Sequence, residues 1–125
     1  MQTSDFDKAF HFYSEILGLR VVREPFLFNG KRTLTWLDAG TCYLELYSIK
    51  IDEEAVEWTD KNLGPVNLAF EVEDIDSSIT WFMHNKVPIL REPFIPPSGD
   101  PNQPRVAFIE GPDKEEILIR ELRIK

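Results

Sequence analysis

REPF stands at residues 23–26 and again at residues 91–94, and the sequence around it repeats as well. DFDKAFHFY, which begins at Asp5, has a counterpart in DIDSSITWF, which begins at Asp74. The separation between the two copies is nearly the same for both segments, so that a single deleted residue reconciles them. A constant separation over more than one segment is typical of a duplicated structural unit. The sequence therefore predicts one supersecondary unit that is used twice.

Each copy begins with an amphipathic helix. In the first copy, Ser4 and Asp5 are good helix caps, and Asp7 is placed to complete a capping box from Ser4. In the second copy Asp74 takes the capping position. Apolar residues then recur at helical spacing in both copies, at Phe6, Phe10, Tyr13 and Leu17 before Gly18, and at Ile75, Ile79, Phe82 and Met83 before Val87-Pro88.

Three segments rich in branched and aromatic residues follow each helix and are predicted strands. They cover residues 19–28, 32–39 and 41–48 in the first copy, and residues 88–94, 105–110 and 115–122 in the second. One more strand, residues 66–73, precedes the second helix, and its counterpart in the first copy is shortened to the residues before Ser4. The predicted fold class is α+β, with two tandem βαβββ modules and a truncated first strand.

The chain of 125 residues reads as a single domain, residues 1–125. Within it, residues 1–50 form the first module, an acidic stretch 51–65 ending in Gly64-Pro65 is a linker, and residues 66–125 form the second module. The proline-rich segment 95–104 is either a lid over a ligand site or a rigid surface loop.

Composition excludes several classes of partner. A net charge of -8 disfavours binding to nucleic acid and to anionic membrane surfaces. No apolar run is long enough to span a bilayer, and the sequence MQTSDFDK shows no secretory signal. A single cysteine, Cys42, rules out an intrachain disulfide and fits a reducing compartment. We therefore expect a cytoplasmic protein.

The combination of SDFDKAFHFYSEILGL, YLELY, NLAFEVEDID and FIEGPDKEEILI resembles the vicinal oxygen chelate superfamily, the group of glyoxalases, bleomycin-resistance proteins and extradiol dioxygenases. The resemblance covers nearly the whole chain. It implies that each module curls its sheet into a half-cup, so that a curved mixed-sheet cup encloses a small-molecule site. It also implies a homodimer.

Enzymes of that family hold a divalent metal with His or Glu side chains from four strands, and the resemblance can be carried over position by position. The first ligand, a His, would lie before Met1. The second corresponds to Glu45, the third to Asn67 in place of His, and the fourth to Leu118 in place of Glu. Because an amide oxygen is a weak ligand for transition metals, we expect a degenerate metal site. A divalent metal is expected only if upstream residues complete that site, and no other cofactor is predicted.

Strand alternation predicts which side chains would line the cup, because residues two apart share a face. The predicted ligand-binding residues are Tyr43, Glu45, Tyr47, Asn67 and Arg120, together with Trp36 and Arg105. A buried carboxylate needs a cation or a proton. We therefore expect Glu45 either to have Arg120 or Arg105 within reach or to take up a proton. The alternative is that these charged groups lie hydrated at an open rim.

The remaining nucleophiles and bases have simpler interpretations. His11 and His84 lie on predicted helices away from the apolar stripes, and we expect both to face solvent. Cys42 has the opposite parity to Glu45 and is predicted to be a buried structural thiol.

Three functions remain open from the sequence, and the catalytic residues are unknown. The first is a metal-independent small-molecule-binding protein, because aromatic walls with a few polar anchors suit such a site. The second is a divalent-metal-dependent lyase or dioxygenase whose first ligand lies upstream of this chain. The third is a non-catalytic interaction module whose cup is filled by side chains. Fold alone does not decide among them.

Overall fold

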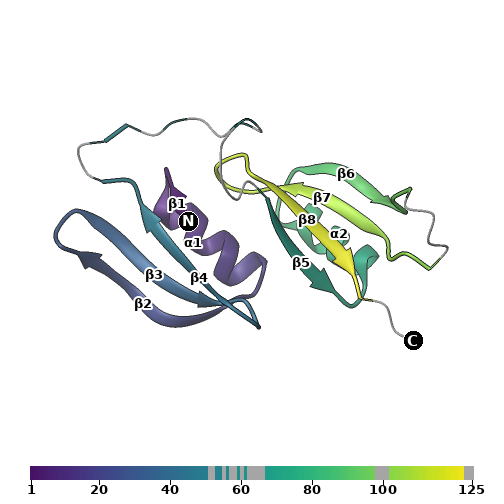
Figure 1. The fold of residues 1–125 in the computed structure, drawn as a ribbon, viewed down its shortest axis with the longest axis horizontal. Coiled ribbons are helices and arrows are strands. Elements are labelled where there is room, and N and C mark those ends of the chain that lie inside the picture. The colour runs from purple at the N-terminus through teal and green to yellow at the C-terminus, as the bar shows by residue number, and fades with distance from the viewer. Residues whose placement is uncertain are drawn as a thin grey trace. The chain divides into compact units, whose positions relative to one another are not determined.

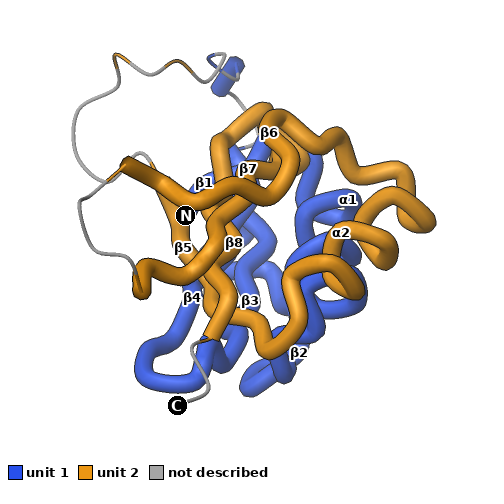
Figure 2. Tube along the Cα trace, turned by 90° about the vertical axis from the view of Figure 1, so that its right-hand side faces the viewer, with its two compact units in different colours: residues 1–57 blue, residues 58–125 orange. Residues whose placement is uncertain are grey.

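The computed structural model describes residues 1–50, 53–54, 56, 59, 61, 67–97 and 102–122. The chain divides into two compact units, Met1–Glu57 and Trp58–Lys125, which are coloured separately in Figure 2. Most of the predicted linker 51–65 and the middle of the proline-rich segment 95–104 lie outside the described residues. Each unit is described below by itself.

The first unit holds a helix and a four-stranded sheet (Figure 1). Strand β1 (Gln2–Thr3) is followed by helix α1 (Phe6–His11), which widens into a π-helical segment, η1 (Phe12–Ile16). Strands β2 (Arg20–Phe28), β3 (Arg32–Asp38) and β4 (Tyr43–Ser48) complete the unit. The sheet order is β1-β4-β3-β2, with β1 parallel to β4 and the other pairs antiparallel.

The second unit repeats this topology (Figure 1). Its elements are β5 (Leu68–Val72), α2 (Ile75–His84), β6 (Ile89–Phe94), β7 (Val106–Glu110) and β8 (Glu116–Glu121). The sheet order is β5-β8-β7-β6, again with only the first pair parallel. The prediction of two tandem βαβββ modules with a short first strand is confirmed. The helices that the model describes are too short to cross a membrane.

The core of each unit lies between the helix and one face of the sheet. Alternate strand residues supply it: Leu46 on β4, and Ile117 and Ile119 on β8, are fully buried. Tyr13 and Ile75 meet them from the helical side and are fully buried too. The opposite face of each sheet is therefore free to carry polar and aromatic side chains, and this is the face that the alternation predicted for a ligand site.

The helix starts match the sequence with one correction. Asp74 caps α2, and its carboxylate accepts hydrogen bonds from the backbone N–H groups of Asp76 and Ser77. In the first unit the N-cap is Asp5, one of the two predicted caps, and its carboxylate accepts a hydrogen bond from the Lys8 N–H at 3.1 Å. Because Asp5 keeps an extended backbone, the helix begins one residue later than a capping box from Ser4 requires.

The REPF motif builds the same irregularity twice. In both units the register with the next strand shifts at the arginine and again before the phenylalanine. The proline between them has no N–H for the ladder, so it fits a bulged strand at the edge of a sheet. In both copies the guanidinium lies over the ring that follows, 3.8 Å from the Phe26 centroid for Arg23 and 3.5 Å from the Phe94 centroid for Arg91. The repeated letters therefore specify a repeated bulge.

The prediction of a buried thiol at Cys42 is wrong, because this residue is exposed. Cys42 lies in the turn before β4, where the Ala39 N–H donates to the Cys42 carbonyl and Gly40 adopts a positive φ of 100°. Strand alternation begins only at Tyr43 and so does not govern the cysteine. His11 and His84 are both exposed, as predicted.

Candidate ligand-binding hollow

The free face of the first sheet carries two rows of side chains fixed by strand register. In one row Arg23 lies opposite Trp36, which lies opposite Glu45. In the next row Phe26 lies opposite Leu34, which in turn lies opposite Tyr47. Neighbours within a row are one strand spacing apart, about 5 Å. The rows therefore bring residues from three strands together on one surface.

These rows line a hollow of about 360 Å³, within the size range of small-molecule sites. Its wall is mainly aromatic and aliphatic, with two guanidinium groups and one carboxylate. The lining residues are Arg23, Phe26, Phe28, Arg32, Leu34, Trp36, Glu45 and Tyr47. All of them belong to β2, β3 and β4, so the first unit forms this hollow by itself.

The structure brings three of the predicted site residues together here: Trp36, Glu45 and Tyr47. Tyr43 lies beside the hollow, with its ring centroid 6.0 Å from that of Trp36, and its side chain is 61% exposed. Glu45 is exposed, and its backbone carbonyl accepts a hydrogen bond from the Met1 amino group at 2.7 Å.

The other predicted residues belong to the second unit. Asn67 is exposed just before β5, and Leu118 is half-buried between Ala69 and Phe108 on the free face of the second sheet. Arg120 is exposed, and its guanidinium lies 3.5 Å from the Glu71 carboxylate.

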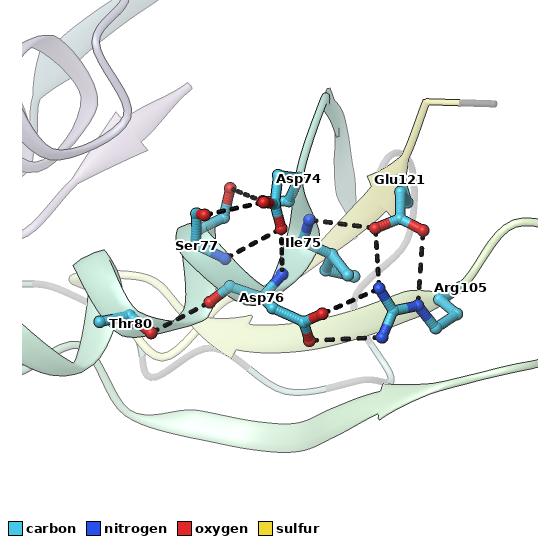
Figure 3. A network of polar contacts seen from close by, with 8 residues as sticks. Asp74, Ile75, Asp76, Ser77, Thr80, Arg105 and Glu121 are labelled. Carbon is cyan, nitrogen blue, oxygen red and sulfur yellow. Dashed lines mark hydrogen bonds and ion pairs between the residues drawn. The ribbon is translucent and has the colours of Figure 1, made fainter. Parts of the chain in front are cut away.

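Arg105 has a structural role that strand parity did not predict. Its guanidinium bridges the carboxylates of Asp76 and Glu121, each at 3.0 Å (Figure 3). Glu121 also accepts a hydrogen bond from the Ile75 N–H at 3.2 Å, so the cluster ties the end of β8 to the start of α2. These hydrogen bonds raise the pKa of the Arg105 guanidinium above its already high usual value.

Both arginines are paired with carboxylates of their own unit, and the expectation that one of them lies within reach of Glu45 stays a prediction. The cations that share the hollow with Glu45 are Arg23 and Arg32. Because Glu45 is exposed to water, its carboxylate does not need a buried counter-ion.

Sequence reasoning missed five lining residues, namely Arg23, Phe26, Phe28, Arg32 and Leu34. Two signals could have found them. Arg32 and Leu34 share the parity of Trp36 on β3, so the alternation rule reaches them once Trp36 is placed inward. The REPF motif marks Arg23 and Phe26, but bulges break strict alternation, and only the register shows which face they occupy.

The family resemblance implies a divalent metal centre, which needs several side chains with donor atoms close together. Among the residues that the model describes, no group of three or more His, Cys, Asp or Glu side chains could hold a metal ion. Glu45 shares its surface with two guanidinium groups, which disfavour a nearby cation. Leu118 has no donor atom, and Asn67 offers only an amide oxygen. The described residues do not fit a divalent metal site.

Solved structures support the fold across nearly the whole chain. The protein SMU.1112c is 25% identical, with a TM-score of 0.80 over 97% of this chain and 93% of its own. A glyoxalase family protein from Enterococcus faecalis is 20% identical, with a TM-score of 0.78 over 96% of this chain and 91% of its own. The trypanothione-dependent glyoxalase I of Leishmania major is 22% identical, with a TM-score of 0.69 over 97% of this chain and 81% of its own.

No curated protein sequence matches the chain. The family model of the Glyoxalase/Bleomycin resistance protein/Dioxygenase superfamily matches residues 1–117. Together with the duplicated βαβββ topology, this match covers both units. The chain belongs to the glyoxalase/bleomycin resistance protein/dioxygenase superfamily.

Proposed function

We propose that this protein binds a small organic molecule in the hollow of its first unit and does so without a divalent metal. One observation carries the proposal: the hollow is walled by aromatic side chains and contains polar groups that could orient a ligand, as small-molecule sites usually do. The exposed aromatic surface supports it further, because Trp36 and Phe28 remain 40% and 47% exposed on this face. A ligand that covers these rings gains hydrophobic stabilisation.

The donor set supports the metal-independent part of the proposal. A ligand on this face would meet guanidinium groups, one carboxylate and aromatic rings, and these can bind and orient a molecule directly. No step of a lyase or dioxygenase reaction follows from these side chains alone. Binding without chemistry is therefore the function that the first unit supports best.

A fragment screen on metal-stripped protein tests the proposal. We expect fragments with an aromatic ring to bind, as detected by ligand-observed NMR, and Trp36→Ala to weaken their binding at least fivefold. Trp81→Ala is a matched control, because Trp81 is a similarly exposed tryptophan, 48% exposed, on α2. Both variants are checked for folding by circular dichroism. Equal binding by the two variants would contradict the proposed site.

Metal analysis of the purified protein separates this proposal from a metal-dependent lyase or dioxygenase. We expect no divalent ion in stoichiometric amount, and fragment binding that is unchanged by a chelator. A tightly held divalent ion whose removal abolishes fragment binding would favour the enzyme.

We also propose a homodimer, which the family resemblance predicts. Sedimentation velocity over a range of protein concentrations measures the mass directly, and a monomer at all concentrations would contradict this part.

A further inference from the structure

Two arginines of the hollow differ from most others in the described chain. Arg20, Arg105 and Arg120 each have a carboxylate within 4.0 Å. Among the described residues, Arg23 and Arg32 form no ion pair, and each guanidinium instead lies over an aromatic ring. Among the described residues Arg91 likewise stacks on a ring without an ion pair, so what sets Arg23 and Arg32 apart is that both line the same hollow.

Each of the two guanidinium groups lies over an aromatic ring of the hollow's lining. Arg23 lies 3.8 Å from the Phe26 ring centroid and Arg32 lies 4.8 Å from the Tyr47 centroid. Phe26 and Tyr47 flank Leu34 in one row across the sheet. Two strand spacings separate the two rings, about 10 Å, so the guanidinium groups stand on opposite sides of Leu34.

Stacking on a ring leaves the planar fork of N–H donors available. A guanidinium held in this way satisfies none of its five donors through the ring, and its flat edge matches the two oxygens of a carboxylate. Stacking also reduces the side-chain freedom that a ligand would otherwise have to remove. The hollow thus offers preorganised anion anchors beside an apolar surface.

From this arrangement, and on the basis of the proposed function, we infer that the hollow selects a small aromatic carboxylate. Its carboxylate would accept hydrogen bonds from Arg23 or Arg32, and its ring would cover Leu34 and the exposed face of Trp36. The aromatic wall distinguishes this ligand from an inorganic anion, which would leave those rings in water.

Glu45 adds a second element of selectivity. It lies directly across from Trp36, at the end of the row that begins with Arg23. A second anionic group on a ligand would approach this carboxylate and be repelled. A hydroxyl or ammonium group there would instead donate a hydrogen bond to it. The hollow should therefore prefer a single negative charge on the ligand.

Three probes of similar shape test the inference by isothermal titration calorimetry on the full chain: naphthoate, the neutral alcohol naphthalenemethanol, and naphthalenedicarboxylate. We expect naphthoate to bind roughly tenfold more tightly than the alcohol, because hydrogen bonds to a charged group are stronger than neutral ones. The dicarboxylate should bind more weakly than naphthoate, and Glu45→Gln should narrow that difference.

Variants locate the anion anchor. Arg23→Gln and Arg32→Gln should each reduce naphthoate affinity several-fold and reduce the weak binding of the alcohol less. Arg20→Gln is the matched control, because Arg20 belongs to the same strand as Arg23 but pairs with Asp38 outside the hollow. The comparison of naphthoate with the alcohol uses the unmodified protein, so it holds even if a variant fails to fold.

The outcomes separate the inference from the proposed function. If the alcohol binds as tightly as naphthoate and Trp36→Ala weakens both, the hollow is a binding site but the anion selectivity is wrong. If none of the three probes binds, the inference is overturned. If Arg20→Gln weakens naphthoate as much as Arg32→Gln does, the effect is general electrostatics and the assigned anchors are wrong.

Discussion

The two units share a backbone frame and differ in the chemistry that they place on it. Corresponding strands have the same order, the same directions and the same pair of register shifts after the helix. Strand register matches their free faces residue by residue: where the first unit has Trp36 and Glu45, the second has Phe108 and Leu118. Tyr47 corresponds in the same way to Arg120. Duplication has kept the geometry while the free faces have diverged.

At the start of the helix, the second unit has the larger set of polar contacts. In the second unit, Arg105 joins Asp76 and Glu121 in a charged cluster at the start of α2 (Figure 3). Register places Ser48 of the first unit where the second has Glu121, and there the Ser48 hydroxyl accepts one hydrogen bond, from the Thr33 N–H at 2.9 Å. The first unit has a hollow lined by aromatic and charged side chains, and the second has a cluster of ion pairs and hydrogen bonds that joins its last strand to its helix. The comparison teaches that fold and site are maintained by different residues of the same repeat.

The largest effect should come from the matched core positions Leu46 and Ile119, both fully buried. We expect Leu46→Ala and Ile119→Ala each to lower the free energy of unfolding by about 2–5 kcal/mol, because a truncated core side chain loses burial and leaves a cavity. Urea denaturation measures both. A loss below about 1 kcal/mol at either position would break the equivalence of the two cores.

A smaller loss of stability should follow when Glu121 is replaced by serine, the residue at the matched position of the first unit, Ser48. Glu121→Ser removes the acceptor of Arg105 and of the Ile75 N–H, and we expect a loss of about 1–2 kcal/mol, since hydrogen bonds to charged groups are the stronger ones. Thermal unfolding measures it. The control is Glu116→Ser at the other end of β8, which lies outside the cluster and should change stability little. Equal losses would show that the cluster adds nothing.

The bulge of the first unit offers a third comparison. The Thr35 hydroxyl, fully buried, donates to the Arg23 carbonyl at 2.6 Å, whereas register places Ala107 at the matched position of the second unit. We expect Thr35→Ala to cost about 1 kcal/mol, because the carbonyl loses its partner. Thr35→Ser keeps the hydroxyl and should restore most of the stability in urea denaturation. Should the serine variant be as unstable as the alanine variant, packing rather than the hydrogen bond would be responsible.

The smallest effect concerns acid. Hydrogen bonds from the backbone and the hydroxyl of Ser77, together with the Asp76 N–H, hold the pKa of Asp74 below its usual value. A lowered pKa in the folded state stabilises the fold above the unfolded-state pKa, about 3.9, and this stabilisation is lost as pH falls through the folded-state value. We expect stability to decline below about pH 4 and Asp74→Asn to decline less, with similar stability at neutral pH because Asn also caps helices. Parallel pH profiles of the two proteins would rule out this contribution.

Local signals predicted most of the fold. Helical spacing, capping residues and alternating strands each act over a few residues, so the element order and the duplication followed from the sequence alone. Exposure of His11 and His84 followed in the same way. The failure at Cys42 lies where a local rule ended, because the strand and its alternation start only at Tyr43. Of the two predicted caps of the first helix, the structure uses Asp5.

The candidate site was predicted only in part. Parity put Tyr43, Glu45 and Tyr47 on one face; Glu45 and Tyr47 line the hollow together with Trp36, and Tyr43 lies beside them. Arg105 was a further candidate because it begins the strand after the proline-rich segment, where parity is uncertain, and the structure pairs it with Asp76 and Glu121. Arg23 was not predicted because its face depends on a double bulge in β2, whereas Arg32 shares the parity of Trp36 and could have been predicted.

The amino-acid sequence by itself determined the repeat, its βαβββ order and the side of each strand that packs against a helix, since these depend on neighbours along the chain. Only the tertiary structure decided which cations line the hollow with Glu45 and which are paired with carboxylates of the second unit. Those contacts are set by the register of strands that are distant in sequence, and a shift of one or two residues in a bulge changes them without altering the hydrophobic pattern that the sequence displays.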